Sequence, residues 1–178
     1  MPFNTNRFRN SFLEVTGKSV SEVLSINPTE YDSISSPIKK AEFVKLLMED
    51  LSQNLPASEA NLIMQSCGKQ CLGNSTIQKA KKLFRESEGL DDFLLRLNEN
   101  HIGGGELCLD GNTILGGYNT CYCGSISKSK EKIPQTYCYC STGWYKRLFE
   151  EVLERPVQIE ILQTIASGSD KCLFRISM

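Results

Sequence analysis

Helical spacing of apolar residues begins at residue 36 and continues to about residue 98. Ser36 and Pro37 supply a helix N-cap and a proline suited to the first turn. The apolar residues that follow at helical spacing are Ile38, Ala41, Phe43, Val44, Leu47, Met48, Leu51 and Leu55. Pro56 ends this stretch, so the pattern predicts one long amphipathic helix between the two prolines.

Shorter helices are predicted to follow the long one. The next helix leads into Cys67 and Cys71, and Gly73 is expected to be its C-cap. A third helix is predicted to begin with a cap at Ser75 and to end near Glu86. A fourth is predicted over 90–98. Together these segments predict a layer of helices in the first half of the chain.

Alternation replaces helical spacing after His101. An Asp-Gly-Asn turn at 110–112 lies between apolar runs and predicts a β-hairpin. A helix is predicted to start near Ser141 or Thr142, and two antiparallel strands are predicted to follow over 157–165 and 172–176. We expect an α+β fold in which the helical N-terminal layer packs on a small antiparallel sheet, with one helix inserted among the strands.

The first 35 residues have a different character. They are rich in Ser, Asn and Thr, and their apolar residues show weak periodicity. We interpret residues 1–35 as a loosely structured arm that packs onto the domain or onto a second subunit. The predicted organisation is therefore this N-terminal arm followed by a single cysteine-rich α+β domain over residues 36–178.

Composition and charge exclude several classes of function. The chain has 178 residues with a net charge of -1 and a pI of about 5.9, and it carries no basic stripe or reader motif, so no nucleic-acid partner is expected. No stretch approaches the roughly 20 apolar residues of a membrane helix. Arg7 and Arg9 are followed by no apolar run of signal-peptide length. We therefore expect a cytoplasmic protein without a membrane partner.

Eight cysteines are the distinctive chemistry of the chain. In a reducing compartment such cysteines indicate metal ligands or reactive thiols more than disulfides. Three close pairs stand out, one spaced for a helix face and two spaced for a strand face. They are Cys67 with Cys71, Cys121 with Cys123, and Cys138 with Cys140.

These six cysteines are the predicted metal ligands, and zinc is the predicted metal because soft divalent ions favour thiolates. An iron–sulfur cluster is an alternative, although its usual cysteine spacings differ. A second alternative is that one of these cysteines is a nucleophilic or redox-active thiol. A third is that the cysteines only pack in the hydrophobic core. Packing is the expected role of Cys108 and Cys172, which we expect to be buried in strands.

A small-molecule pocket is predicted between the helical layer and the sheet. Tyr118 and Trp144 are expected to wall it, and Tyr145 is a further candidate wall residue, with core packing as the alternative for Trp144 and Tyr145. His101 is the only histidine and is a candidate ligand or base, or alternatively a solvated residue at the junction before three glycines. Those glycines lack the spacing of a dinucleotide-binding loop.

The C-terminal stretch resembles the small-ligand-binding domains typified by the bacteriochlorophyll 4-vinyl reductase family. The residues that carry the resemblance are a V-x-I-E run at 157–160, Gly168 with Asp170, and a C-x-F-x-I strand at 172–176. With its cysteine pairs, the chain looks closer to an uncharacterised cysteine-rich bacterial family related to that group. A similar ending occurs in a family named for hydrolysis of 2-amino-thiazoline-4-carboxylate. The resemblance implies a domain that binds a small molecule and often forms a homodimer.

The function predicted from the sequence is a small-molecule-binding or sensory domain with a cysteine-ligated metal. The alternative is a thiol-dependent hydrolase or reductase in which a cysteine of a C-Y-C triplet is the nucleophile. His101, Glu106 or Asp110 would then be the base. A third hypothesis treats the cysteines as packing and the arm as a dimer contact.

Overall fold

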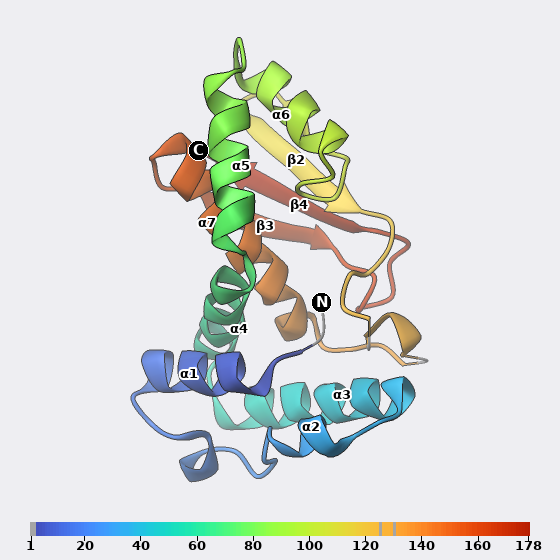
Figure 1. Cartoon of the computed structure of the whole chain (residues 1–178). Helices are drawn as coiled ribbons and strands as arrows, with labels where there is room; N and C mark the ends of the chain where they lie inside the picture. Colours follow the sequence, from blue (N-terminus) through green and yellow to red (C-terminus); the bar gives the residue numbers. More distant parts are fainter. Residues whose placement is uncertain (1–2, 125, 130) are drawn as a thin grey trace.

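The computed structural model describes residues 3–124, 126–129 and 131–178, and Figure 1 shows the arrangement of its elements. The helices are α1 (Thr5–Thr16), α2 (Glu30–Ser33), α3 (Pro37–Asn54), α4 (Ala57–Cys71), α5 (Asn74–Arg85), α6 (Leu90–Glu99) and α7 (Tyr139–Leu153). The strands are β1 (Cys108–Asp110), β2 (Thr113–Tyr118), β3 (Gln158–Gln163) and β4 (Cys172–Ser177). Short 3₁₀ turns are η1 (Val20–Glu22), η2 (Ile126–Lys128) and η3 (Gln135–Cys138). Within the described part of the chain, no helix has both the length and the apolar character needed to cross a membrane.

The described strands form one antiparallel sheet of four strands in the order β1-β2-β4-β3. The predicted hairpin turn is confirmed, because Gly111 adopts a φ of 59° between β1 and β2. Buried and half-buried residues alternate along β4, with Cys172, Phe174 and Ile176 facing the core. The α+β class and the insertion of α7 between the hairpin and the last two strands are likewise confirmed.

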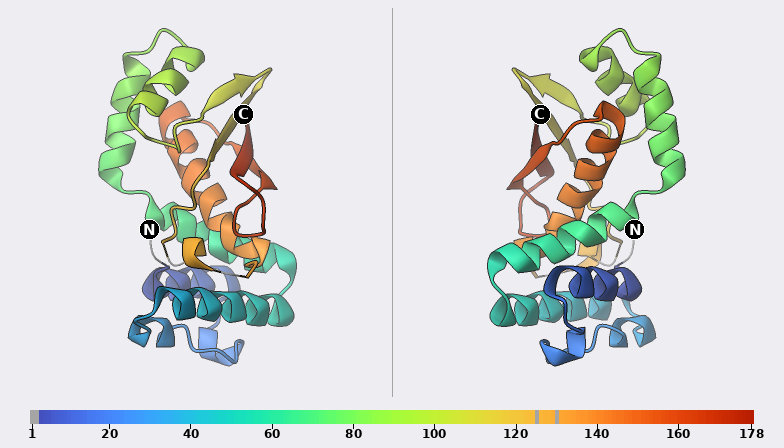
Figure 2. Two further views of the ribbon diagram at one scale, coloured as in Figure 1. Left: turned by 90° about the vertical axis from the view of Figure 1, so that its right-hand side faces the viewer. Right: turned by 90° about the vertical axis from the view of Figure 1, so that its left-hand side faces the viewer.

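The described residues form two hydrophobic cores that lie at opposite ends of the molecule. The first, which we call the helical core, includes side chains of α1, α3 and α4 together with Ile126, Ile133, Tyr137 and Cys138. The second, the sheet core, includes side chains of α5, α6, α7 and the sheet. Figure 2 shows α7 lying between the sheet and the α5–α6 pair. The predicted helical layer is thus divided, because α1, α3 and α4 build a core of their own instead of covering the sheet.

The N-terminal segment is not loosely structured, so this part of the prediction was wrong. Helix α1 begins after Asn4, whose side chain accepts a hydrogen bond from the Arg7 amide, and ends at Gly17. Phe8 and Phe12 are 0% exposed. The apolar periodicity of this segment is weak because part of the buried face of α1 is polar. Ser11, for example, is buried and hydrogen-bonds to a side chain of α4. Residues 1–2 of the predicted arm lie outside the described residues, and the domain boundary itself stays a prediction.

Candidate functional site

Two glycines set the contact between α4 and α7. A Cβ atom on Gly68 would lie 1.8 Å from the carbonyl oxygen of Cys140, and a Cβ atom on Gly143 would lie 1.8 Å from that of Gln65. The two backbones can approach this closely only because both positions lack a side chain. The first turn of α7, which carries Cys140, therefore packs directly against the last turns of α4.

A cavity of about 400 Å³ lies where the two cores meet, and we call it the seam cavity. Its walls include aromatic rings from the hairpin, the following segment and α7, and its remaining lining consists of small polar, thiol and glycine residues. The lining residues are Cys71, His101, Gly103, Gly104, Tyr118, Tyr122, Cys123, Cys140, Ser141, Trp144 and Tyr145. Cys123 and Cys140 pack against the helical core, whereas Tyr118, Trp144 and Tyr145 belong to the sheet core or pack on it. The cavity therefore occupies space that neither core fills.

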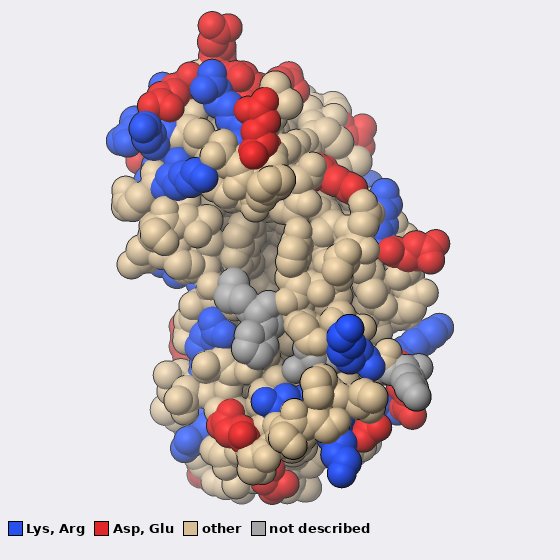
Figure 3. All heavy atoms as spheres, turned by 45° about the vertical axis from the view of Figure 1, so that its right-hand side comes forward, with Lys and Arg blue, Asp and Glu red and all other residues tan. Residues whose placement is uncertain are grey.

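The lining of the seam cavity is close to uncharged. Among its described lining residues there is no Asp, Glu, Lys or Arg. Burial raises the pKa of Tyr118 and that of Tyr145, so both phenols are neutral hydrogen-bonding groups at neutral pH. The space-filling view in Figure 3 shows a hollowed, mostly uncharged stretch in the middle of one face. These properties favour an apolar or aromatic guest over a charged one.

One rim of the cavity is a strained backbone segment. His101 has a φ of 53°, and Gly103 and Gly104 have φ values of 85° and 98°. A Cβ atom on Gly104 would lie 2.1 Å from the carbonyl oxygen of Gly117, so the rim also needs a residue without a side chain there. The Tyr145 hydroxyl donates a 2.8 Å hydrogen bond to the Gly103 carbonyl and ties this rim to α7. Glycine adopts a positive φ freely, whereas the left-handed conformation of His101 persists only where surrounding contacts hold it.

Three thiols and a phenol gather on the helical-core side of the cavity. The thiols of Cys121 and Cys140 and the hydroxyl of Tyr137 hydrogen-bond to Cys123. These hydrogen bonds, that of Cys121 foremost, lower the pKa of Cys123 to about 3, against the opposing effect of burial. The pKa of Cys140 is raised in turn, chiefly because it donates to Cys123 and also because it is buried. The arrangement favours one thiolate held by neutral donors.

The other buried cysteines have the opposite character. Burial raises the pKa of Cys67 to about 11 and that of Cys138 to about 12, although Ser11 and Thr164 respectively hydrogen-bond to them. Burial also raises the pKa of Cys172, which is 3% exposed on β4 as predicted. These thiols are protonated at neutral pH.

Cys108 departs from the prediction that it is buried. It lies on β1, at the edge of the sheet, and is exposed. The alternation around it was read correctly as a strand, but an edge strand of three residues leaves its outer side chains in solvent.

The six predicted metal ligands do not meet in one place. Cys67 hydrogen-bonds to Ser11 and Cys138 to Thr164, so neither is among the thiols that hydrogen-bond to Cys123. Among the residues that the structure describes, no group of three or more His, Cys, Asp and Glu side chains is arranged to hold a metal ion. Zinc or iron–sulfur ligation by these cysteines therefore stays a prediction.

The reason lies in the local backbone of the C-Y-C triplets, which the sequence placed on strands. Residues 121–123 follow the end of β2, and residues 138–140 run from η3 into the first turn of α7. Side chains two apart share a face on a strand but not on a helix. The helix thus starts at Tyr139, before the predicted Ser141 or Thr142, and the strand-based pairing of the second triplet was wrong. Gly73 likewise begins α5 instead of capping α4.

The structure brings the three predicted pocket residues together. His101, Tyr118 and Trp144 all line the seam cavity, although whether it binds a ligand is untested. Tyr145, the further candidate wall residue, also lines the cavity, whereas sequence reasoning missed Ser141, three residues before Trp144. The spacing 141, 144 and 145 places these side chains on one face of α7, and that signal could have found Ser141.

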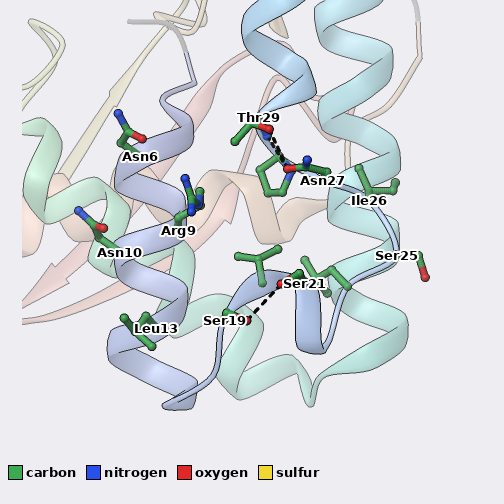
Figure 4. A pocket seen from close by; sticks show the side chains of 13 residues that line it. Asn6, Arg9, Asn10, Leu13, Ser19, Ser21, Ser25, Ile26, Asn27 and Thr29 are labelled. Carbon is green, nitrogen blue, oxygen red and sulfur yellow. Dashed lines mark hydrogen bonds between the residues drawn. The ribbon is translucent and has the colours of Figure 1, made fainter.

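A larger cavity of about 700 Å³ lies between α1 and residues 19–29, and Figure 4 shows its lining. Asn, Ser and Thr side chains dominate it, and internal hydrogen bonds such as that from the Thr29 hydroxyl to Asn27 satisfy part of them. Its described lining holds no aromatic ring and no thiol, and Arg9 is its one charged residue. It therefore lacks the aromatic walls and reactive groups that gather at the seam cavity.

Comparison with known proteins places the chain in a family but gives no function. No curated protein matches the chain. One similar solved structure is an NMR structure of a mutant H-NOX domain from Shewanella oneidensis in the Fe(II)CO ligation state, with 13% identity, 97% of each chain covered and a TM-score of 0.38. At that TM-score the likeness carries no argument about fold or function, and the likeness to 4-vinyl reductase is not shown. Residues 11–178 match the model described as "Family of unknown function (DUF6144)", and the chain belongs to this family.

Proposed function

We propose that the protein binds a small, uncharged, aromatic or apolar molecule in the seam cavity. The observation that carries this proposal is a cavity of about 400 Å³ lined by four aromatic side chains and by no Asp, Glu, Lys or Arg among its described residues. Pockets of this size with apolar walls and a few fixed polar groups are typical of small-molecule sites. Tyr118 and Ser141, whose hydroxyl oxygens lie 2.6 Å apart, are the polar groups that would orient the guest.

The position of the cavity gives binding a structural consequence. Its walls come from both cores, so a bound molecule would contact the thiol side and the aromatic side at once. A ligand that binds only the folded chain stabilises it by mass action. A domain with such a cavity is suited to sensing, because occupation would tighten the joint between its two halves.

The chain offers a specific reporter for this test. Trp144 is its only tryptophan and lines the cavity. The probe is N-phenyl-1-naphthylamine, an uncharged aromatic dye that accepts excitation energy from tryptophan, and it is added to the reduced protein. Wild-type protein is expected to show saturable energy transfer from Trp144 to the dye.

Two substitutions at one position separate filling of the cavity from loss of a hydroxyl. Ser141→Leu places a branched side chain in the cavity and is expected to abolish the energy transfer. Ser141→Ala removes the hydroxyl next to Tyr118 without filling the space and is expected to retain it. Equal dye binding by wild-type protein and the leucine variant, with both folded, would rule out the seam cavity as the site.

Metal binding and dimer formation are separate proposals. Zinc held by some of the six predicted cysteines would give close to stoichiometric metal in elemental analysis of protein purified under reducing conditions. Metal-free, fully folded protein would contradict it without affecting the cavity proposal. The homodimer is tested by the mass of the protein in solution.

A further inference from the structure

Cys123 and Cys140 have a relation that the binding proposal does not use. They come from separate segments, the stretch after β2 and the first turn of α7. Their side chains hydrogen-bond to each other, and both line the seam cavity. Each of these thiols therefore has a neighbouring thiol with which it can form a disulfide. A small reactant can reach both through the cavity.

We propose that Cys123 and Cys140 form a redox pair that exchanges with low-molecular-weight disulfides reaching it through the seam cavity. This inference rests on the proposed function for its route of access. Its chemistry is separate, because it requires covalent reaction at two named sulfur atoms.

The reaction balances as two thiol–disulfide exchanges. The Cys123 thiolate attacks one sulfur of a disulfide RSSR, a mixed disulfide between Cys123 and R forms, and RS⁻ leaves and takes a proton from water. The Cys140 thiol then loses its proton to water and attacks the Cys123 sulfur, which expels the second RS⁻. Starting from one thiolate and one thiol, the protein gives up one proton and two electrons and gains one internal disulfide, and RSSR becomes one RSH and one RS⁻, which then equilibrates with water.

The contacts distinguish the two roles. Cys123 accepts hydrogen bonds from Cys121, Cys140 and Tyr137, so its sulfur carries the stabilised negative charge and attacks first. Cys140 lies on α7 and is positioned to resolve the mixed disulfide. Cys121 also contacts Cys123 but does not line the cavity, so the partner thiol on the cavity side of Cys123 is that of Cys140.

The donors around Cys123 also set the direction of the equilibrium, because they stabilise the reduced sulfur that accepts their hydrogen bonds. A group that stabilises the reduced form makes the corresponding disulfide easier to reduce. We therefore expect the pair to be reduced at a low ratio of disulfide to thiol and to oxidise only when the disulfide is in large excess. This is the behaviour of a reversible switch more than of a structural disulfide.

The test uses the reduced full-length protein and excess oxidised glutathione as the probe. Intact mass, released thiol and peptide mapping are followed with time at neutral pH. In the wild-type protein we expect loss of two hydrogens and a disulfide-linked peptide pair that contains Cys123 and Cys140. Cys140→Ser is expected to trap one glutathione on Cys123. Cys123→Ser is expected to lower the initial rate on the order of tenfold or more.

Cys108→Ser is the matched control, because Cys108 is exposed and lies on β1, away from the seam cavity. It is expected to leave the formation of the internal disulfide unchanged. Peptide mapping of the wild-type protein decides the question even if a variant fails to fold. A disulfide that maps to Cys71 or Cys121, or glutathione that accumulates on Cys108 alone, overturns the proposal.

The two proposals fail in different ways. Dye binding by reduced protein without selective reaction at Cys123 would overturn the redox pair and leave the binding cavity. Selective formation of the disulfide between Cys123 and Cys140 in protein that does not bind the dye would overturn the binding function and leave the redox pair.

Discussion

Thiols in two regions of this molecule have opposite chemistry. Cys67 and Cys138 lie inside the helical core, where removal from water raises the pKa of each to about 11 and about 12. Cys123 lies at the seam, where hydrogen-bond donors lower its pKa to about 3. All three are cysteines, but Cys67 and Cys138 are buried whereas Cys123 is half-buried. Side-chain donors from three residues reach the Cys123 sulfur, whereas one side-chain hydroxyl reaches each of the other two, so the donors at Cys123 outweigh the effect of its burial.

The contrast depends on two well-packed cores that leave a cavity between them. Phe8 and Phe12 fill the helical core and Phe149 and Phe174 fill the sheet core, each with 0% exposure. Among the described residues, no side chain fills the seam between the cores in this way, and the seam is lined by small, polar and aromatic residues. The predictions below test this arrangement in order of decreasing expected effect.

The largest effect is expected from emptying a core. Phe12→Ala in the helical core and Phe174→Ala in the sheet core should each lower the free energy of unfolding by about 3–5 kcal/mol, because each leaves a cavity. Denaturant unfolding at fixed pH measures both. If Phe12→Ala alone left the free energy of unfolding unchanged, α1 would be a loosely attached arm, and the helical core would not be well packed.

Separating the helices that join the cores should have the next largest effect. Gly143→Ala places a methyl group 1.8 Å from the Gln65 carbonyl oxygen, so α4 and α7 must move apart at a cost of about 3 kcal/mol. Gly89→Ala is the control, because nothing lies within 4 Å of the added methyl group. It should change the free energy of unfolding by less than about 1 kcal/mol. Equal effects of the two variants would mean that the helices are not in close contact.

Removing the hydrogen bond that holds the rim of the seam cavity should have a moderate effect on the free energy of unfolding. Tyr145→Phe removes the donor to the Gly103 carbonyl, and the loss of this buried hydrogen bond should cost about 1–2 kcal/mol. Because the rim would lose its tie to α7, dye binding should weaken as well. Thermal unfolding and dye titration of the same sample measure the two effects. An unchanged dye affinity would show that the rim does not shape the cavity.

The most direct test of the contrast is the pH dependence of stability, where the effect expected from Cys67 is the smallest. The folded-state pKa of Cys67 is raised from 9.0 to about 11, so its contribution is complete below pH 9 and is lost as the pH rises towards 11. At pH 10 this loss amounts to about 1 kcal/mol. Cys67→Ala should therefore flatten the fall in stability between pH 8 and 10, whereas Cys108→Ala should not.

Cys123 should show the opposite sign. Its pKa is lowered in the folded state, so its contribution is present above the ordinary thiol value of 9.0 and is lost as the pH falls towards about 3. Cys123→Ser should flatten the loss of stability on acidification. If both cysteine variants change the pH profile in the same direction, the contrast between the two regions is wrong.

Local patterns in the sequence were enough for much of the secondary structure. The long helix between Pro37 and Pro56, the Asp-Gly-Asn hairpin and the two C-terminal strands were predicted from spacing and turn residues, because those signals act over a few neighbouring residues. Helix α1 was missed because part of its buried face is polar and has partners on other elements, as Ser11 has on Gln70. No pattern within a single segment reports such partners.

The sequence by itself determined the α+β class, the unusual number of thiols and the aromatic residues near them. Only the tertiary structure decided which sulfurs meet. The two-residue spacing of Cys138 and Cys140 suggested a shared face, but the backbone turns into α7 between them and sends one to Thr164 and the other to Cys123. The pKa of a thiol depends on donors that arrive from distant segments, and their approach is set by contacts such as that of Gly68 with Cys140. Spacing along the chain carries no information about that approach.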